Sequence, residues 1–269
     1  MPSPWIFHWS FDPVAAQIGS LAIHWYGLCW GLAFLQADYA SQKMLARLGR
    51  QDVDVGMLTL STMVGTIVGA RLAHCLFYDP AFYLSHPLKI FAIWEGGMAS
   101  HGGVLGFLFA IAWAARRYAP GLPLLTLLDV VSLPASLGGA IVRMANFLNS
   151  EILGVATSGS WGVVFDRIDP HPRIPVQLCE AAAYALVGLV LFWQYRSRGA
   201  LAAAGRMTGW FLVLVFGARA VLESWKMPQA AYEAGATISV GQWLSLPFVL
   251  LGIGLVLRSR RAGQIRNDT

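Results

Sequence analysis

The stretch GMLTLSTMVGTIVGARLAHCLFY, residues 56–78, decides the fold class of this chain. Arg71 is its single residue with a full charge at neutral pH. An apolar run of this length matches an α-helix that crosses the hydrocarbon core of a bilayer. We predict a membrane-spanning helix here, because a lone strand in lipid would leave its backbone groups without hydrogen-bond partners.

Six further apolar segments extend the prediction to a bundle, at residues 15–37, 102–117, 121–141, 177–195, 207–224 and 239–257. The composition agrees, because 57% of the chain is hydrophobic and only 12% is charged, whereas soluble domains carry about 25% charged residues. We predict an all-α polytopic membrane protein with about seven transmembrane helices, forming a single membrane domain over residues 1–269. The stretch 144–176 is predicted to be a small periplasmic or interfacial insertion between the fourth and fifth helices.

The basic residues predict the orientation. Twelve of the 19 follow the first, third, fifth and seventh segments, on one side of a seven-helix arrangement: Lys43, Arg47, Arg50, Arg116, Arg117, Arg196, Arg198, Arg206, Arg258, Arg260, Arg261 and Arg266. The positive-inside rule assigns that side to the cytoplasm, so we expect the N-terminus outside and the C-terminus inside. The net charge of +5 then reflects topology and lipid headgroups rather than nucleic-acid binding.

The other seven basic residues lie in, or at the outer ends of, segments that should be poor in positive charge: Arg71, Lys89, Arg143, Arg167, Arg173, Arg219 and Lys226. Ionisable residues inside membrane segments are rare and usually functional. Their number predicts a functional site at the outer face.

The densest polar cluster is RMANFLNSEILG, residues 143–154. Arg143 ends an apolar segment, where an arginine either anchors in the headgroups or binds a phosphate through two parallel hydrogen bonds. Asn146, Asn149 and Glu151 add polar groups within three turns, which is more than an anchor needs. Gly154 lies on the turn that follows. The sequence therefore favours a functional site here.

Two further features each have two interpretations. His101-Gly-Gly begins the third segment, and the histidine is either an acid–base group near neutrality or an interfacial histidine beside helix-packing glycines. Arg219 and Glu223 are four residues apart and face the same side of a helix. They form either an internal ion pair or an arginine that a glutamate holds for a phosphate.

Weaker candidates are Gln177 and Glu180 at the start of the fifth segment, Tyr26 in the first, and Arg71 near the end of the second. Taken alone, each fits an ordinary structural role, such as helix-start chemistry or an aromatic belt. The sequence holds no metal-ligand spacing, no nucleophile elbow and no Gly-Lys-Ser/Thr phosphate loop.

These residues resemble the prolipoprotein diacylglyceryl transferase family. Residues 143–154 are similar to its signature, which typically reads Gly-Arg-x-Gly-Asn-Phe-x-Asn-x-Glu-x-x-Gly. Further matches follow in order from about residue 24 to 247: HWYG at 24–27, GAR at 69–71, YDP at 78–80, EGGMASHGG at 95–103, PVQLCE at 175–180, Arg219 with Glu223, and GQWLSLP at 241–247. Val142, Ala145, Ile174 and Cys179 depart from the usual residues and leave the charged and amide groups in place.

The resemblance implies an enzyme of the bacterial inner membrane with its site towards the periplasm. It would transfer the sn-1,2-diacylglyceryl group of phosphatidylglycerol to the lipobox cysteine thiol of a preprolipoprotein. A thioether forms and glycerol-1-phosphate leaves. The substrates are a membrane lipid and a signal peptide, and the family needs no metal or redox cofactor.

This reaction gives each candidate a role. Arg143 and Arg219 would stabilise the phosphate by electrostatics, and His101 would take the thiol proton, with Tyr26 as the alternative or helper. Orientation or binding of the substrate is expected from the remaining candidates: Asn146, Asn149, Glu151, Gly154, Gln177, Glu180, Arg71 and, through Arg219, Glu223. The rivals are a transporter with a buried ion pair and a catalytically silent paralogue that binds lipid or signal peptides.

Overall fold

The structure is a computed structural model that describes residues 5–19, 21–197, 201, 203–227 and 239–267. The described chain is mostly helical, with two small β-sheets. It divides into two compact parts, one of Met1–Ala37 with Leu128–Thr269 and one of Asp38–Leu127. Each part is described below by itself.

Two helices, α2 (Val55–Phe77) and α4 (Ser100–Tyr118), pack closely in the part from Asp38 to Leu127. Asp54 begins α2 by accepting a hydrogen bond from the backbone N–H of Met57 at 3.0 Å, which satisfies one free donor of the first turn. Glycines set the closeness of the packing, because a Cβ atom on Gly69 or Gly102 would overlap the backbone of the facing helix. Small residues of this kind let helices approach without side chains between them.

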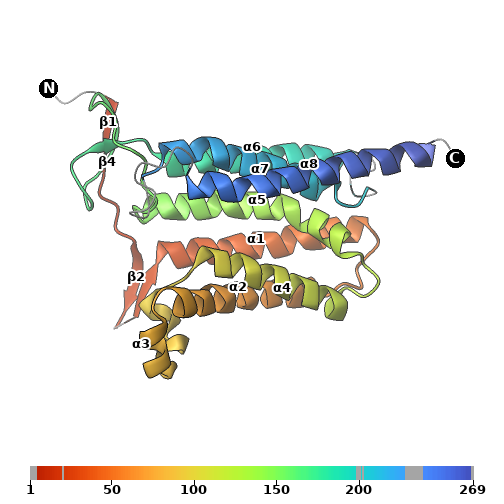
Figure 1. Cartoon of the computed structure of the whole chain (residues 1–269), viewed down its shortest axis with the longest axis horizontal. Coiled ribbons are helices and arrows are strands. Elements are labelled where there is room, and N and C mark those ends of the chain that lie inside the picture. Colours follow the sequence, from red (N-terminus) through yellow and green to blue (C-terminus); the bar gives the residue numbers. More distant parts are fainter. Residues whose placement is uncertain (1–4, 20, 198–200, 202, 228–238, 268–269) are drawn as a thin grey trace. The chain divides into compact units, whose positions relative to one another are not determined.

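Between α2 and α4 the chain forms a short irregular segment. It contains α3 (Pro80–Ser85) and the 3-10 turns η1 (Pro87–Phe91) and η2 (Ile93–Glu95). In Figure 1, α3 projects from one end of α2. Large apolar side chains of this segment are exposed, among them Leu84, Leu88 and Trp94.

The other part contains the longest helices. They are α5 (Leu124–Leu148, whose first residues belong to the other part), α6 (Val176–Arg196), α7 (Arg206–Leu222), which continues into the 3-10 turn η3 (Glu223–Trp225), and α8 (Val240–Asn267). Asp129 of α5 stabilises the start of α7. Its buried carboxylate accepts hydrogen bonds from the backbone N–H groups of Gly205 at 2.6 Å and Thr208 at 2.7 Å. The free N–H groups of a first helical turn favour an anion in this position.

A three-stranded sheet lies at the end of α5 where the signature residues are (Figure 1). Its order is β1-β4-β5, with β1 (Trp5–Trp9) parallel to β4 (Trp161–Phe165) and β4 antiparallel to β5 (Pro172–Arg173). The ring of Trp9 packs on the ring of Phe147 of α5, with centroids 4.6 Å apart. The ring of Phe165 packs on Phe147 as well, with centroids 5.7 Å apart. This aromatic core attaches the sheet to the last turn of α5.

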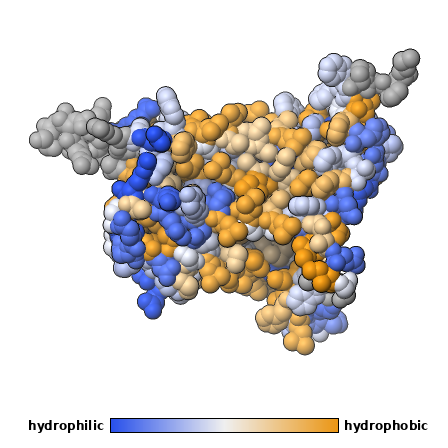
Figure 2. Space-filling view, turned by 180° about the vertical axis from the view of Figure 1, so that it is seen from behind, coloured by the Kyte–Doolittle hydropathy of each residue, from blue (hydrophilic) through white to orange (hydrophobic). Residues whose placement is uncertain are grey.

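Five described helices are long and apolar enough to cross a membrane: α2, α5, α6, α7 with η3, and α8. The chain is therefore a multi-pass membrane protein. In Figure 2, hydrophobic residues cover the middle of the helices and hydrophilic ones gather towards the ends. The remaining long helices, α1 (Trp25–Arg47) and α4, are less apolar, so the prediction of seven spans is met only in part.

The prediction of a first helix over residues 15–37 was wrong at its start. Residues 14–24 form a β-hairpin, with β2 (Val14–Ile18) antiparallel to β3 (Leu21–His24), and α1 begins only at Trp25. Gly19, at a positive φ of 60°, precedes the second strand. A short apolar run fits a strand as well as a helix. This hairpin and the sheet also correct the all-α prediction, and α5 continues to Leu148, into the predicted insertion 144–176.

Candidate functional site

The signature segment 143–154 makes a sharp turn after α5. Ser150 and Ile152 have positive φ angles of 55° and 53°. Residues other than glycine rarely adopt such angles, and β-branched residues such as isoleucine almost never do. Such conformations cost about 1–3 kcal/mol each and persist where the surrounding structure enforces them, often at functional sites. Glu151 lies between these two residues, so the strained turn fixes the direction of its carboxylate.

Amide side chains surround that carboxylate. Asn146 donates to Glu151 Oε2 at 3.4 Å and Asn149 donates to Oε1 at 2.6 Å. Gln177, fully buried at the start of α6, donates to the backbone carbonyl of Glu151 at 2.6 Å. Its own Oε1 is buried and has no hydrogen-bond partner among the described residues. The predicted residues Asn146, Asn149, Glu151 and Gln177 therefore form one polar cluster at the end of α5.

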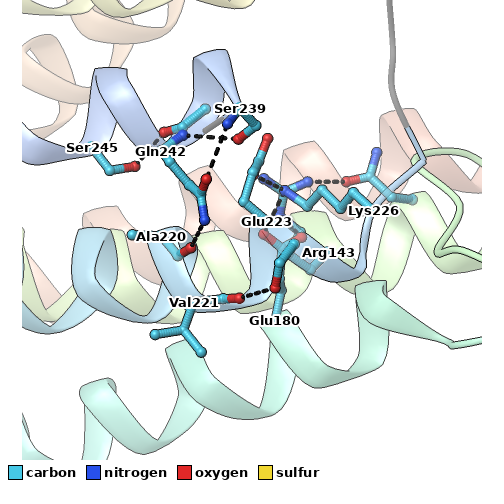
Figure 3. A network of polar contacts seen from close by, with 12 residues as sticks. Arg143, Glu180, Ala220, Val221, Glu223, Lys226, Ser239, Gln242 and Ser245 are labelled. Atoms are coloured by element: carbon cyan, nitrogen blue, oxygen red, sulfur yellow. Dashed lines mark hydrogen bonds and ion pairs between the residues drawn. The ribbon is translucent and has the colours of Figure 1, made fainter. Parts of the chain in front are cut away.

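A chain of alternating charges continues from this cluster (Figure 3). Arg143 donates through Nη1 to Asn146 Oδ1 at 3.3 Å, and its Nε lies 3.1 Å from Glu180 Oε2. The second contact is an ion pair without the alignment of a good hydrogen bond. The other oxygen of Glu180, Oε1, lies 2.9 Å from Lys226 Nζ, and the same ammonium group lies 2.8 Å from Glu223 Oε2.

Burial makes these ion pairs strong and interdependent. The side chain of Glu180 is 0% exposed, that of Lys226 5%, and those of Arg143 and Glu223 13% each. A charge removed from water is costly unless an opposite charge or hydrogen bonds accompany it. Glu180, predicted as a substrate-binding residue, is enclosed between two cations and the hydroxyl of Tyr184 at 3.5 Å. Its geometry is that of a group that positions Arg143.

Lys226 is the member of this network that the site prediction missed. It lies just beyond α7, and the site prediction stopped at Arg219 and Glu223. One signal was available, because Lys226 belongs to the seven basic residues that the positive-inside rule does not explain.

The expected ion pair between Arg219 and Glu223 is not formed. The helical backbone reaches Glu223, whose N–H donates to the carbonyl of Arg219, and the chain tightens into η3 from this residue on. In a 3-10 turn, side chains three residues apart eclipse each other, so Glu223 meets Lys226 instead. Arg219 lies within electrostatic range of the Tyr184 hydroxyl, as Arg143 does.

Gly154 is held by backbone contacts on both sides. A Cβ atom there would overlap the carbonyl of Ile174. The flanking residues pair with the segment after α7, with Val155 N–H donating to the carbonyl of Trp225 at 2.8 Å and Met227 N–H to that of Leu153 at 3.0 Å. Glycine at this position allows the close approach that joins the signature segment to the end of α7.

Arg173 of β5 supports the same junction. It donates to the carbonyl of Gly154 at 3.2 Å and to the carboxylate of Asp169 at 2.5 Å. The hydrogen bond from Arg173 holds the pKa of the Asp169 carboxyl below its usual value. Both residues belong to the loop that carries the sheet.

Arg71 has a different setting from the one predicted. Its guanidinium is buried and all five of its N–H groups donate to backbone carbonyls of the segment between α2 and α4, those of Lys89, Ile90, Ala92, Gly96 and Gly97. An arginine has only five such donors. Arg71 therefore fixes this segment and retains no donor for a substrate phosphate.

His101 and Tyr26 are the two candidates for the thiol base. His101 is the second residue of α4, with an exposed side chain, in the part from Asp38 to Leu127. The glycine beside it, Gly102, packs against α2, as the structural interpretation of His101-Gly-Gly predicted. Tyr26 is half-buried at the start of α1, in the other part. Proximity of either residue to Arg143 stays a prediction.

Comparison with known proteins gives a consistent result over nearly the whole chain. A family model described as prolipoprotein diacylglyceryl transferase matches residues 13–258. A protein of Tolumonas auensis is 49% identical over 253 residues, covering 94% of this chain and 97% of its own. One of Chloroherpeton thalassium is 40% identical, covering 99% of both chains. One of Porphyromonas gingivalis is 36% identical, covering 96% of both. Each is named phosphatidylglycerol–prolipoprotein diacylglyceryl transferase.

Proposed function

Because this chain belongs to the prolipoprotein diacylglyceryl transferase family, we propose that it transfers the sn-1,2-diacylglyceryl group of phosphatidylglycerol to a preprolipoprotein. The acceptor is the thiol of the lipobox cysteine, and the products are a thioether and glycerol-1-phosphate. The observation that carries the proposal is the guanidinium of Arg143 at the signature turn, oriented by Glu180 and Asn146, with the buried Lys226 on the other oxygen of Glu180.

The reaction exchanges one bond for another. The thiolate sulfur attacks the glyceryl carbon that bears the phosphate, the carbon–sulfur bond forms, and the carbon–oxygen bond breaks. The electron pair of the broken bond leaves on the phosphate of glycerol-1-phosphate. The enzyme therefore has two tasks, which are to stabilise charge on the phosphate and to take the thiol proton.

Arg143 is suited to the first task. Glu180 faces its Nε and Asn146 accepts from Nη1, so these two contacts fix the orientation of the guanidinium. Neither contact uses Nη2, and a phosphate binds an arginine best through two parallel N–H groups. Because Glu151, Glu180 and Glu223 place three carboxylates near the cations of the network, phosphate binding depends on the donors of Arg143 that the carboxylates leave unused.

The turn at Glu151 is suited to binding a headgroup. Phosphatidylglycerol carries hydroxyl groups beyond its phosphate, and hydroxyls need both donors and acceptors. The carboxylate of Glu151, the amides of Asn146 and Asn149, and the unpaired Oε1 of Gln177 supply both kinds. These groups would orient the headgroup so that its phosphate meets the arginines.

The second task falls to His101 or Tyr26. A histidine suits proton transfer near neutral pH, and an exposed His101 is open to an incoming thiol. Tyr26 is the alternative base or a helper. Replacing each by phenylalanine or glutamine and measuring the pH dependence of transfer would separate the two roles.

The proposed setting is the bacterial inner membrane, with seven spans, α1 and α4 included. The N-terminus and residues 149–175, which carry the sheet, would face the periplasm and the C-terminus the cytoplasm. Both substrates would enter sideways from the lipid. Membrane-impermeant labelling of Thr157→Cys and Gln51→Cys in oriented vesicles tests this, because only Thr157→Cys should react from the periplasmic side.

The decisive assay measures glycerol phosphate release by the purified chain in detergent, given phosphatidylglycerol and a lipobox peptide. Release that requires the peptide cysteine supports the proposal. Release that persists with a serine peptide indicates a phospholipase, and binding of both substrates without release indicates an inactive paralogue. Arg143→Ala should abolish release, whereas the matched control Arg116→Ala, at an exposed arginine near the end of α4, should keep it.

A further inference from the structure

Lys226 occupies an unusual environment for a lysine. Its side chain is 5% exposed and its ammonium group lies within 3 Å of two carboxylates, Glu180 at 2.9 Å and Glu223 at 2.8 Å. Lysines are almost never fully buried unless they are paired. Two carboxylates for one ammonium group is more pairing than the lysine needs. The arrangement is better explained by what the lysine does for the carboxylates.

The position of Lys226 is fixed by its backbone. It forms an antiparallel β-bridge with Gly154, and the hydrogen bonds at Val155 and Met227 flank this bridge. Its N–H donates to the carbonyl of Glu223 at 3.1 Å. The backbone of Lys226 is therefore tied to the signature segment, and its ammonium group lies beside Glu180.

Glu180 connects Lys226 to Arg143. The two cations approach different oxygens of this one carboxylate, Oε1 and Oε2. Without the lysine, Glu180 Oε1 and Glu223 Oε2 would each lose their ion pair with the ammonium group, and Arg143 would still be paired with Glu180. A carboxylate with two free oxygens pairs with a guanidinium through two parallel hydrogen bonds. That pairing would occupy the donors that a phosphate needs.

We propose that Lys226 is a positioning residue for phosphatidylglycerol: it neutralises Glu180 and Glu223 and so keeps donors of Arg143 free for the phosphate. This rests on the proposed function, in which Arg143 binds the phosphate. Lys226 acts through Glu180 and its role is charge balance. The affinity for the phosphatidylglycerol headgroup then depends on the balance between carboxylates and cations around Arg143.

The test compares three variants in the transfer assay at varied mole fractions of phosphatidylglycerol. Lys226→Met removes the charge and keeps the length of the side chain. Lys226→Arg keeps the charge. The double variant Lys226→Met/Glu223→Gln removes one cation and one carboxylate, which restores the balance. Lys43→Met, at an exposed lysine of α1, is the matched control.

Lys226→Met is expected to raise KM for phosphatidylglycerol by roughly tenfold or more, as loss of a close charge in a partly dry site would, with kcat changed far less. Lys226→Arg and the double variant should recover most of the affinity, and Lys43→Met should match the wild type. A purely structural lysine would give a double variant at least as impaired as Lys226→Met, and that result would overturn the proposal. So would an unchanged KM in Lys226→Met.

Equilibrium binding of phosphatidylglycerol without peptide separates this inference from the proposed function. A wild type that binds the lipid and releases no glycerol phosphate contradicts the proposed function, while the order of affinities among the variants still tests Lys226. Thermal unfolding in detergent shows which variants fold. If Lys226→Met does not fold, recovery of folding and binding in the double variant supports charge balance, and failure of both refutes it.

Discussion

Arg71→Met removes all five guanidinium donors and keeps the length of the apolar side chain. The carbonyl of Ala92 lies in a buried residue and loses its partner without access to water, at a cost of about 1–3 kcal/mol. The other four carbonyls belong to exposed or half-exposed residues and exchange the arginine for water, at about 0.5–1 kcal/mol each. We expect the segment between α2 and α4 to lose about 3–7 kcal/mol of local stability.

Hydrogen exchange measured by mass spectrometry in detergent tests this loss. Amides within residues 86–97, such as those of Lys89 and Ala92, are hydrogen-bonded inside the segment and should exchange faster by roughly two to five orders of magnitude, since each 1.4 kcal/mol is tenfold. Arg116→Met is the control and should leave exchange there unchanged. Equal protection of residues 86–97 in Arg71→Met and the wild type would refute the structural role of Arg71.

Three other substitutions test the site and its support. Arg143→Lys keeps the charge and loses the parallel donors, so kcat/KM for transfer should fall by about 100-fold or more; a loss below threefold contradicts phosphate binding by the guanidinium. Gly154→Ala places a methyl group against the Ile174 carbonyl and should destabilise the fold by about 1–3 kcal/mol. The melting temperature and the rate of transfer should fall together; a melting temperature equal to that of the wild type would contradict the close approach. Asp169→Asn removes the partner of Arg173. Because the pKa of Asp169 is lowered in the folded state, its stabilising effect is present above its unfolded pKa of about 3.9 and disappears as the pH falls through the lower folded value. The variant should therefore expose the 161–173 hairpin to protease at neutral pH and lose the acid sensitivity of the wild type; identical cleavage profiles across pH would contradict this.

The helices could be predicted because membrane helices are determined by local composition. Residues 56–78, 177–195 and 207–224 fell within two residues of α2, α6 and α7, since a long apolar run has few other stable forms in lipid. Residues 14–24 misled the prediction, because an apolar hairpin and the start of an apolar helix have the same composition. The parallel pairing of β1 with β4 joins residues more than 150 positions apart, and no local pattern indicates it.

The site could be predicted only where its residues are close in sequence. Asn146, Asn149 and Glu151 form one cluster because a single turn carries them. Lys226 was missed because its partner Glu180 lies on another helix, and the distance along the chain says nothing about that contact. For Arg71, the sequence could not separate a substrate contact from five bonds to its own backbone.

The end of α7 shows that site residues can be predicted from the sequence while their contacts in the structure differ from the predicted ones. The spacing of Arg219 and Glu223 favours an ion pair, but the 3-10 turn that begins at Glu223 brings Lys226 within 2.8 Å of its carboxylate. Glu223 pairs with Lys226 and Glu180 with both Lys226 and Arg143, whereas Arg219 forms no ion pair among the described residues. Under the proposed function, Arg219 is then available to a phosphodiester. A variant that pairs Arg219 with Glu223 by extending α7 as a regular helix should therefore bind phosphatidylglycerol more weakly.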